Sequence, residues 1–169
     1  MVETLITIRR AKLSDAQDIA EVHDAAWREA YRGIIPGSEL EKMIQRRGPR
    51  WWQSAIERGS RLCVLDFDET VGGYISYGRN RLPHMQQGGE IFELYLAPEF
   101  QGLGFGRKLF EAARHDLRQN GLKSFVVWAL SDNARAVEFY QHLGGKFVHR
   151  ADERFGKDLL PRSAYAFGE

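Results

Sequence analysis

The segment Gln101-Gly102-Leu103-Gly104-Phe105-Gly106 contains three glycines at alternate positions. These glycines limit the kinds of loop and binding site that this part of the chain can form. The apolar run before them, residues 91–97, favours a strand, and the periodic run after them, residues 106–120, favours a helix. Glycines leave backbone N–H groups unshielded, and the first turn of a helix adds its own unpaired N–H groups and the positive end of its dipole. A strand, a glycine loop and a helix in this order predict a binding site for phosphate or pyrophosphate.

The common nucleotide-binding motifs do not fit this loop. A Walker loop requires Gly-Lys-Ser/Thr, but here Gly106 is followed by Arg107 and Lys108. A G-x-G-x-x-G fingerprint that starts at Gly102 has Arg107 in its third glycine position, and the next register has Leu109 there. A nucleotide-binding regulator is therefore the weakest of the hypotheses for this chain.

A second motif lies downstream of the loop. Asn133, Ala136, Phe139 and Tyr140 have the spacing N-x-x-A-x-x-F-Y, and a glycine pair follows at 144–145. With the loop as Q-x-x-G-x-G and a strand between the two motifs, the chain resembles the GNAT family of N-acetyltransferases. In that family the glycine loop binds the pyrophosphate of acetyl-CoA.

The resemblance spans about residues 7–167, is strongest over 90–147, and implies a single N-acetyltransferase domain over 1–169. Strands are predicted over 5–9, 61–65, 71–78, 90–96, 124–130, 147–150 and 164–167. Helices are predicted over 14–31, from 36 to the break at 48–49, and over 51–58, 106–120 and 133–143. A hairpin followed by a β-α-β unit indicates an α/β fold with a mixed, mainly antiparallel central sheet and helices on both faces. The resemblance implies that the fourth and fifth strands splay apart to hold the cofactor.

The composition is that of a soluble globular protein, with 43% hydrophobic and 28% charged residues in a chain of 169. A net charge of +1 gives no general attraction to nucleic acid or membranes, so neither is expected as a partner. The single cysteine, Cys63, excludes a disulfide within the chain. No signal peptide or membrane span is visible, and no histidine has metal-ligand spacing, so we expect a cytoplasmic protein without a metal.

The resemblance assigns the binding of the cosubstrate acetyl-CoA to residues in three separate segments. Pantetheine would lie along the fourth strand like an added strand, with the Leu94 N–H as a candidate oxyanion donor. Asn133, a carried-over cofactor contact, is also well suited to cap its helix. The cofactor-binding residues implied are Leu94, Tyr95, Leu96, Gln101, Gly102, Leu103, Gly104, Phe105, Gly106, Arg107 and Asn133.

The catalytic assignments are Tyr140, Glu93 and Glu90. Tyr140 matches the position that often protonates the leaving thiolate in this family, and the alternative is a core aromatic. Strand alternation places Glu93 on the face of Ile91 and Tyr95, and Glu90 on the opposite face. Glu93 is the favoured base because it is nearer the thioester. An ordinary glutamate pKa near ~4.3 would require burial or a water relay.

The acceptor pocket has no distinctive signature in the sequence. Trp27 and Tyr31 form an i, i+4 aromatic pair that either belongs to the core or encloses an amine. The loop of residues 155–160 is a second expected contributor, whereas Arg46-Arg47 is interpreted as solvated surface. Antibiotics, amino acids, polyamines and protein N-termini all stay open as acceptors, and so does a homodimer.

Two functional hypotheses follow. The first is an acetyl-CoA-dependent N-acetyltransferase, in which a primary amine of a small molecule or peptide attacks the thioester directly. The alternative is a catalytically silent acyl-CoA-binding sensor module. The presence of Tyr140, Glu93 and Glu90 argues against loss of catalysis.

Overall fold

The computed structural model describes residues 5–168, which form a seven-stranded sheet in the order β1-β2-β3-β4-β5-β7-β6. The strands are β1 (Ile6–Arg10), β2 (Arg61–Phe67), β3 (Thr70–Arg79), β4 (Gly89–Leu96), β5 (Phe125–Leu130), β6 (Lys146–Phe155) and β7 (Asp158–Phe167). All neighbouring strands are antiparallel except β4 and β5, which are parallel. The predicted mixed, mainly antiparallel sheet is confirmed.

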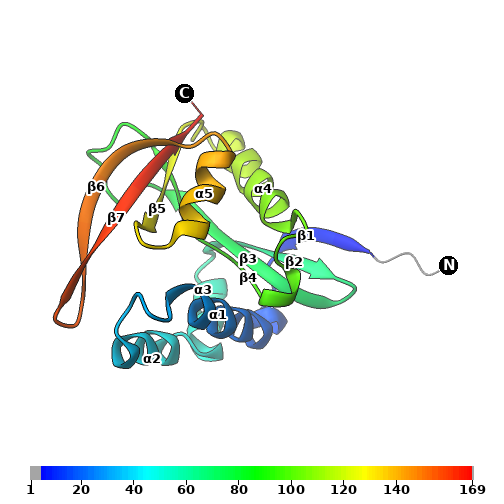
Figure 1. Cartoon of the computed structure of the whole chain (residues 1–169). Coiled ribbons are helices and arrows are strands. Elements are labelled where there is room, and N and C mark those ends of the chain that lie inside the picture. The colour runs from blue at the N-terminus through cyan, green and yellow to red at the C-terminus, as the bar shows by residue number, and fades with distance from the viewer. Residues whose placement is uncertain (1–4, 169) are drawn as a thin grey trace.

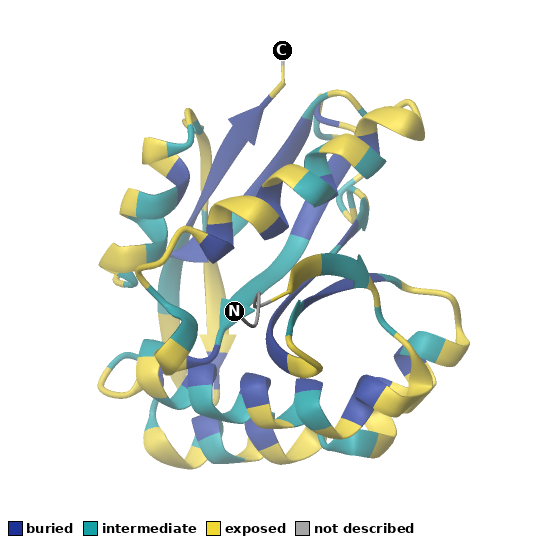
Figure 2. Ribbon diagram, turned by 90° about the vertical axis from the view of Figure 1, so that its right-hand side faces the viewer, coloured by how far each residue is buried: buried dark blue, intermediate teal, exposed yellow. Residues whose placement is uncertain are grey.

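Helices cover both faces of this sheet, as predicted. They are α1 (Ala16–Tyr31), α2 (Gly37–Arg46), α3 (Pro49–Glu57), α4 (Phe105–Gln119) and α5 (Ala134–His142), with short 3-10 turns η1 (Leu13–Asp15) and η2 (Pro98–Phe100). Figure 1 shows α1, α2 and α3 on one side of the sheet and α4 and α5 on the other. In Figure 2 the buried positions of the helices face the sheet and the exposed positions face outward. Within residues 5–168, no helix is long and apolar enough to cross a membrane.

The predicted splay lies between β4 and β5. These strands pair over only three positions, from Gly89 opposite Phe125 to Ile91 opposite Val127. After Ile91 no register partner joins them, so the two strands diverge toward their carboxyl ends. The splay is confirmed, and it leaves one edge of the second half of β4 without a neighbouring strand.

A β-bulge in β4 reverses part of the predicted side-chain alternation. Ser76 of β3 lies opposite Glu93 and Tyr77 opposite Ile91, so Phe92 is the extra residue. Ile91 therefore packs in the same core cluster as Leu94, on the α4 side of the sheet. The prediction that Glu93 shares a face with Ile91 is wrong, because the bulge shifts the alternation by one residue.

The closing hairpin is longer than predicted. The expected strands over 147–150 and 164–167 are parts of β6 and β7, which have ten residues each. The expected loop over 155–160 consists of strand ends around a tight turn. Nearly every residue of β6 is exposed at the sheet edge, so it lacks the apolar alternation that marks a half-buried strand.

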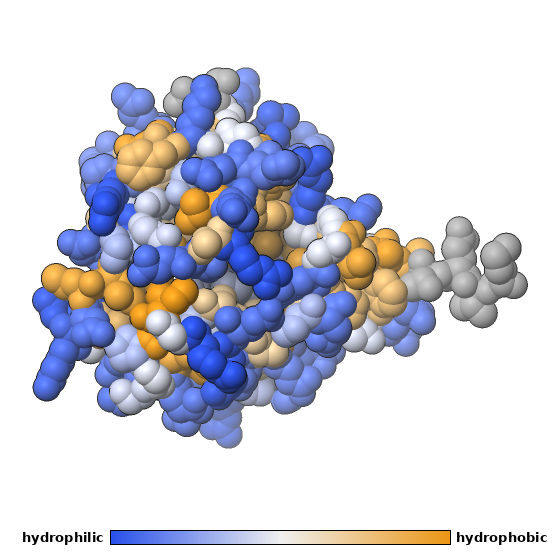
Figure 3. All heavy atoms as spheres, in the orientation of Figure 1, coloured by the Kyte–Doolittle hydropathy of each residue, from blue (hydrophilic) through white to orange (hydrophobic). Residues whose placement is uncertain are grey.

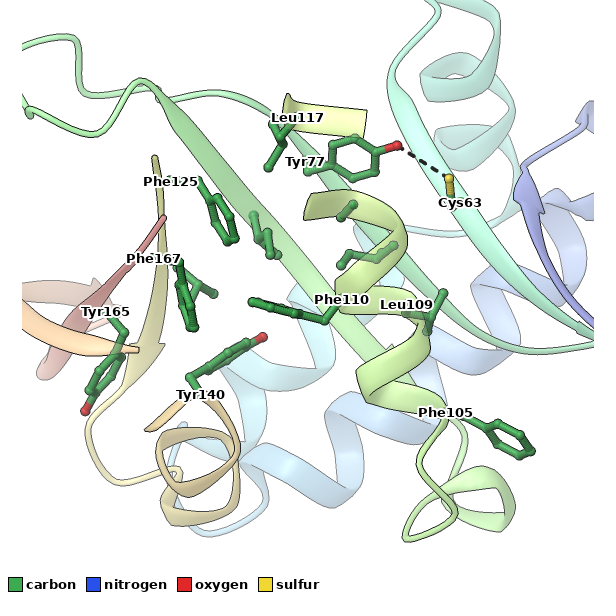
Figure 4. Close-up of a cluster of buried hydrophobic side chains, with 14 of the residues drawn as sticks. Cys63, Tyr77, Phe105, Leu109, Phe110, Leu117, Phe125, Tyr140, Tyr165 and Phe167 are labelled. Atoms are coloured by element: carbon green, nitrogen blue, oxygen red, sulfur yellow. Dashed lines mark hydrogen bonds between the residues drawn. The ribbon is translucent and has the colours of Figure 1, made fainter. Parts of the chain in front are cut away.

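The largest core cluster fills the space between the sheet and helices α4 and α5. Leu109, Phe110 and Leu117 of α4 are fully buried against Phe125 of β5 and Phe167 of β7. Figure 4 shows Phe110 of α4 together with Phe125 and Phe167 of the sheet in the space between the helix and the strands. A second and a third cluster pack α1, α2 and α3 against the opposite face. The sheet is thus held between two apolar layers.

A buried histidine in the α1 layer makes stability depend on pH. His23 is fully buried beside the rings of Trp27 and Trp52, and neither ring nitrogen has a hydrogen-bond partner among the described residues. Burial, with a smaller effect from the charge of Arg47, lowers the pKa of His23 to about 3. In the unfolded chain the histidine pKa is near ~6.5. Between pH 3 and pH ~6.5 the unfolded chain therefore binds a proton at His23 that the folded chain does not bind.

We predict that the free energy of unfolding is highest above pH ~6.5 and falls by up to about 1.4 kcal/mol per pH unit as the pH drops toward 3. His23→Phe should flatten this slope, since an apolar ring does not titrate and leaves no unpaired nitrogen. Urea unfolding at several pH values measures the slope. His115→Phe, at an exposed position of α4, is the matched control. Equal slopes for wild type and His23→Phe would contradict the assignment.

Candidate functional site

The glycine loop has the backbone geometry that its sequence predicts. Gly104 caps the start of α4 with φ of 84°, and Gly102 has φ of 74°. Both angles lie in the region that side chains disfavour. No atom lies within 4 Å of the position where a Cβ would stand on either residue. The loop therefore presents bare backbone to the adjoining space.

Unpaired N–H groups gather at this loop. Within the described part of the chain, the N–H groups of residues 102–104 donate to no backbone carbonyl. The first helical bond runs from the Lys108 N–H to the Gly104 carbonyl at 3.3 Å, so the N–H groups of residues 105–107 precede it. Together with the helix dipole, these donors have the chemistry needed to hold a phosphate group.

A groove with a volume of about 540 Å³ begins at the loop and runs along the second half of β4. In Figure 3, apolar side chains are visible between polar ones in the hollow near the middle of this face. Ten of the predicted site residues line the groove: Leu94, Tyr95, Leu96, Gln101, Gly102, Gly104, Gly106, Arg107, Asn133 and Tyr140.

Two predicted cofactor residues lie outside the groove. The Leu103 side chain is 63% exposed. Phe105 is buried in the core, where its ring packs against Phe67 and Phe100. The side chains at these two positions therefore have solvent or core contacts, and only their backbone can contribute to the loop.

The open edge of β4 carries unpaired backbone groups into the groove. The Ala97 N–H donates to the Gly72 carbonyl on the β3 side, so alternation directs the polar groups of Leu94 and Leu96 to the open side. The Leu96 carbonyl accepts from Nε2 of Gln101 at 3.0 Å. Gln101 thus ties the loop to β4, and the Leu94 N–H and carbonyl stay available to a ligand.

Asn133 and Tyr140 both combine structural contacts with groove positions. The Asn133 side chain accepts from the Ala136 N–H at 3.3 Å, which caps α5. Tyr140 is 5% exposed, and its ring packs against Phe139. Figure 4 shows Tyr140 extending from α5 toward Phe110 of α4. Burial, with a smaller effect from Tyr31, raises the pKa of the Tyr140 phenol, so it stays neutral at pH 7.

A second, smaller cavity of about 160 Å³ adjoins the groove. Tyr95 lines both spaces, and its hydroxyl is hydrogen-bonded to that of Tyr31. Trp27 and Tyr31 line this cavity, which is the pocket where an acceptor was expected. The principal lining residues are Trp27, Tyr31, Arg47, Arg81, Phe92, Glu93, Tyr95, Trp128, Glu153, Phe155 and Arg162.

Glu93 reaches this second cavity within a network. One carboxylate oxygen pairs with Arg47, and the other accepts from the Tyr74 hydroxyl at 2.7 Å. The Arg47 guanidinium lies 4.4 Å from the Trp51 ring centroid and 5.7 Å from that of Trp27. Desolvation lowers the pKa of Arg47. The interpretation of Arg47 as solvated surface is therefore wrong.

Glu90 lies outside both cavities. It is 2% exposed, and its oxygens accept from the Arg81 N–H at 3.0 Å and from the Arg81 guanidinium at 2.7 Å. The structure gives Glu90 the role of anchoring the loop after β3. Of the two predicted bases, only Glu93 borders a cavity.

Several pocket residues were not anticipated from the sequence, among them Arg81, Trp128, Glu153 and Arg162. They come from the loop after β3, from β5 and from the long hairpin, which meet only in the folded sheet. Trp128 is the one aromatic residue after the aliphatic pair Val126 and Val127 of β5, and that was the one local signal available.

Comparison with known proteins agrees with this geometry. The sequence profile of the acetyltransferase (GNAT) family matches residues 19–145. YuaI of Bacillus subtilis, an uncharacterized N-acetyltransferase, is 34% identical over 137 residues, which is 81% of this chain and 78% of that protein. Spermidine N(1)-acetyltransferase of Thermoplasma acidophilum is 23% identical over 95% of this chain and 98% of that protein.

Solved structures share the fold. The PaiA N-acetyltransferase from Thermoplasma acidophilum, in complex with coenzyme A, matches with a TM-score of 0.76 at 22% identity. The match covers 94% of this chain and 98% of that one. The family match over most of the chain, the relative at 34% identity and the loop-and-groove geometry lead to one conclusion. This chain belongs to the acetyltransferase (GNAT) family and is an acetyl-CoA-dependent N-acetyltransferase.

Proposed function

We propose that the groove binds acetyl-CoA with the pyrophosphate on the glycine loop and the pantetheine along the open edge of β4. A primary amine of a small molecule or peptide then attacks the thioester directly from the adjoining pocket. The observation that carries this proposal is the groove itself, which runs from the loop past Leu94 to Tyr140 and meets the second cavity at Tyr95. Its residues fit the cosubstrate because they supply N–H donors at one end and unpaired strand edges at the other.

The reaction forms a C–N bond and breaks the C–S bond of the thioester. The amine loses a proton on the way, and the departing thiolate gains one. In the proposal the Leu94 N–H stabilises the carbonyl oxygen as negative charge develops on it. Tyr140 donates a hydrogen bond to the leaving sulfur, since its buried phenol is neutral at pH 7.

Glu93 is the proposed base. It borders the acceptor pocket, and Arg47 and Tyr74 hold its carboxylate in place. With one oxygen paired to Arg47, we propose that Glu93 takes the proton from the amine through a bridging water. Glu90 has no part in the proposal, because it lies outside both cavities.

A substitution in the loop tests the placement of the pyrophosphate. Gly104→Val should lower CoA affinity by about 100-fold or more, since a branched side chain would occupy the open space that the phosphate needs. Titration calorimetry with CoA measures this. Gly121→Val is the matched control, because Gly121 also has a positive φ, 77°, and open space at its Cβ position, but it lies outside the groove. Unchanged CoA affinity in a folded Gly104→Val protein would refute the placement.

A second variant tests the role of Tyr140. Tyr140→Phe should reduce kcat by about 100-fold and leave CoA affinity unchanged, because only the group that assists the leaving sulfur is lost. Thiol release from acetyl-CoA is measured against pools of amino acids, polyamines, aminoglycosides and short peptides. Tyr165→Phe, which removes another hydroxyl from the same core cluster but outside the groove, is the control.

The outcomes separate the two functional hypotheses. Release that falls in Tyr140→Phe and not in Tyr165→Phe supports catalysis through Tyr140. Equal rates in wild type and Tyr140→Phe would return Tyr140 to a purely structural role. CoA binding without release in any pool would favour the sensor module.

A further inference from the structure

The acceptor pocket contains more arginine than acid, and this inference about its ligand rests on the proposed acetyl transfer. Arg47, Arg81 and Arg162 line the pocket together with Glu93 and Glu153. Arg47 is paired with Glu93, and Arg81 is paired with Glu90, which lies behind the pocket. The charges of these two arginines are therefore already balanced.

Arg162 differs from the other two arginines. None of the ion pairs within residues 5–168 involves it. Its Nε is buried without a hydrogen-bond partner among the described residues. The enclosed Nε is itself out of a ligand's reach, whereas the two terminal Nη groups are not among the enclosed atoms, so they are the donors that can meet a ligand anion.

The position of Arg162 suits recognition of a carboxylate. It lies on β7 opposite Leu130, the last residue of β5, at the open end of the splay. Its guanidinium carbon is 4.3 Å from the centroid of the Trp128 ring. Stacking on a ring restrains the guanidinium plane and leaves its N–H edge free, and that edge matches a carboxylate with two parallel hydrogen bonds.

The size of the pocket limits the ligand. Its volume of about 160 Å³ is well below the ~300 Å³ or more of pockets that hold drug-sized molecules. Aromatic side chains such as Trp27, Phe92 and Phe155 form much of its surface. A small molecule fits these dimensions, whereas a long polycation would exceed them and would bring further positive charge to the unpaired Arg162.

We propose that the acceptor is an α-amino acid, or an equally small amine that carries a carboxylate next to the reacting nitrogen. Arg162 binds the carboxylate, and the amine is directed toward Tyr95 and the cofactor groove. Glu153 on β6 also lines the pocket, and no ion pair within residues 5–168 involves it. Its carboxylate complements the positive charge of the acceptor's ammonium group before that group loses its proton. Among the acceptors left open by the sequence, this selects the amino acids.

Matched acceptor series test the proposal. Thiol release is measured with L-amino acids, with the corresponding amino-acid amides and with polyamines. We expect the acids to have at least 10-fold higher kcat/KM than the amides, because only the acids engage Arg162. Arg162→Gln should raise KM for the acids by about 10- to 100-fold, change the amides by less than about threefold, and leave KM for acetyl-CoA unchanged.

Two further variants keep the result specific. Arg162→Lys should recover part of the preference for acids, since it keeps the charge but loses the planar fork. Arg154→Gln, an exposed position of the same hairpin outside the pocket, should leave all constants unchanged. Amides or polyamines that react as well as the acids would overturn the inference and leave the acetyltransferase proposal intact.

A binding measurement does not depend on turnover. Pools of N-acetyl-amino acids and of N-acetyl-amino-acid amides are added to the CoA-loaded protein, and the shift in Tm is recorded. Stabilisation by the acids alone, lost in Arg162→Gln, supports the carboxylate site even if no thiol is released with any acceptor. Equal shifts for the two pools, or no shift with either, would overturn the inference.

Discussion

The pairing of β4 with β5 stops at Ile91, and the groove exists because of that interruption. Backbone N–H and carbonyl groups inside a protein need partners, so an edge opened in the middle of a sheet must be satisfied in another way. Gln101 satisfies the Leu96 carbonyl, which fixes the glycine loop at the end of the strand. The Leu94 groups stay open to a ligand. The same interruption therefore places both ends of the proposed cofactor site, one through the Gln101 side chain and the other through the free edge of β4.

The bulge at Phe92 determines which face of the sheet the Glu93 side chain points to. Without the extra residue, Glu93 would point with Ile91 into the α4 core, where a carboxylate would be desolvated without a partner. With it, Glu93 turns to the α1 side and meets Arg47 and Tyr74. Two neighbouring irregularities of one strand, an early end of pairing and a shifted alternation, thus put an acceptor pocket against a cofactor groove.

Local features were readable from the sequence, and features made by distant contacts were not. The glycine loop and the Asn133 cap were predictable because their backbone geometry depends on adjacent residues. The family resemblance supplied the splay. The face of Glu93 was misassigned because no glycine or proline marks the bulge at Phe92. Arg47 was misread because the tryptophans that surround its guanidinium come from two helices. The extent of β6 was underestimated because an exposed edge strand carries little apolar alternation. Arg162 became visible only when the hairpin placed it beside Trp128.

Gly106 lines the groove at the point where α4 lies close to α5. A Cβ at this position would lie 3.2 Å from the Phe139 ring, which is closer than ordinary van der Waals contact. The first turn of α4 and the body of α5 are therefore as near to each other as a missing methyl group allows. A side chain at 106 would require the Phe139 ring to shift by a few tenths of an ångström. The close approach of the two helices beside the groove therefore depends on one absent carbon atom on α4 and one aromatic ring on α5.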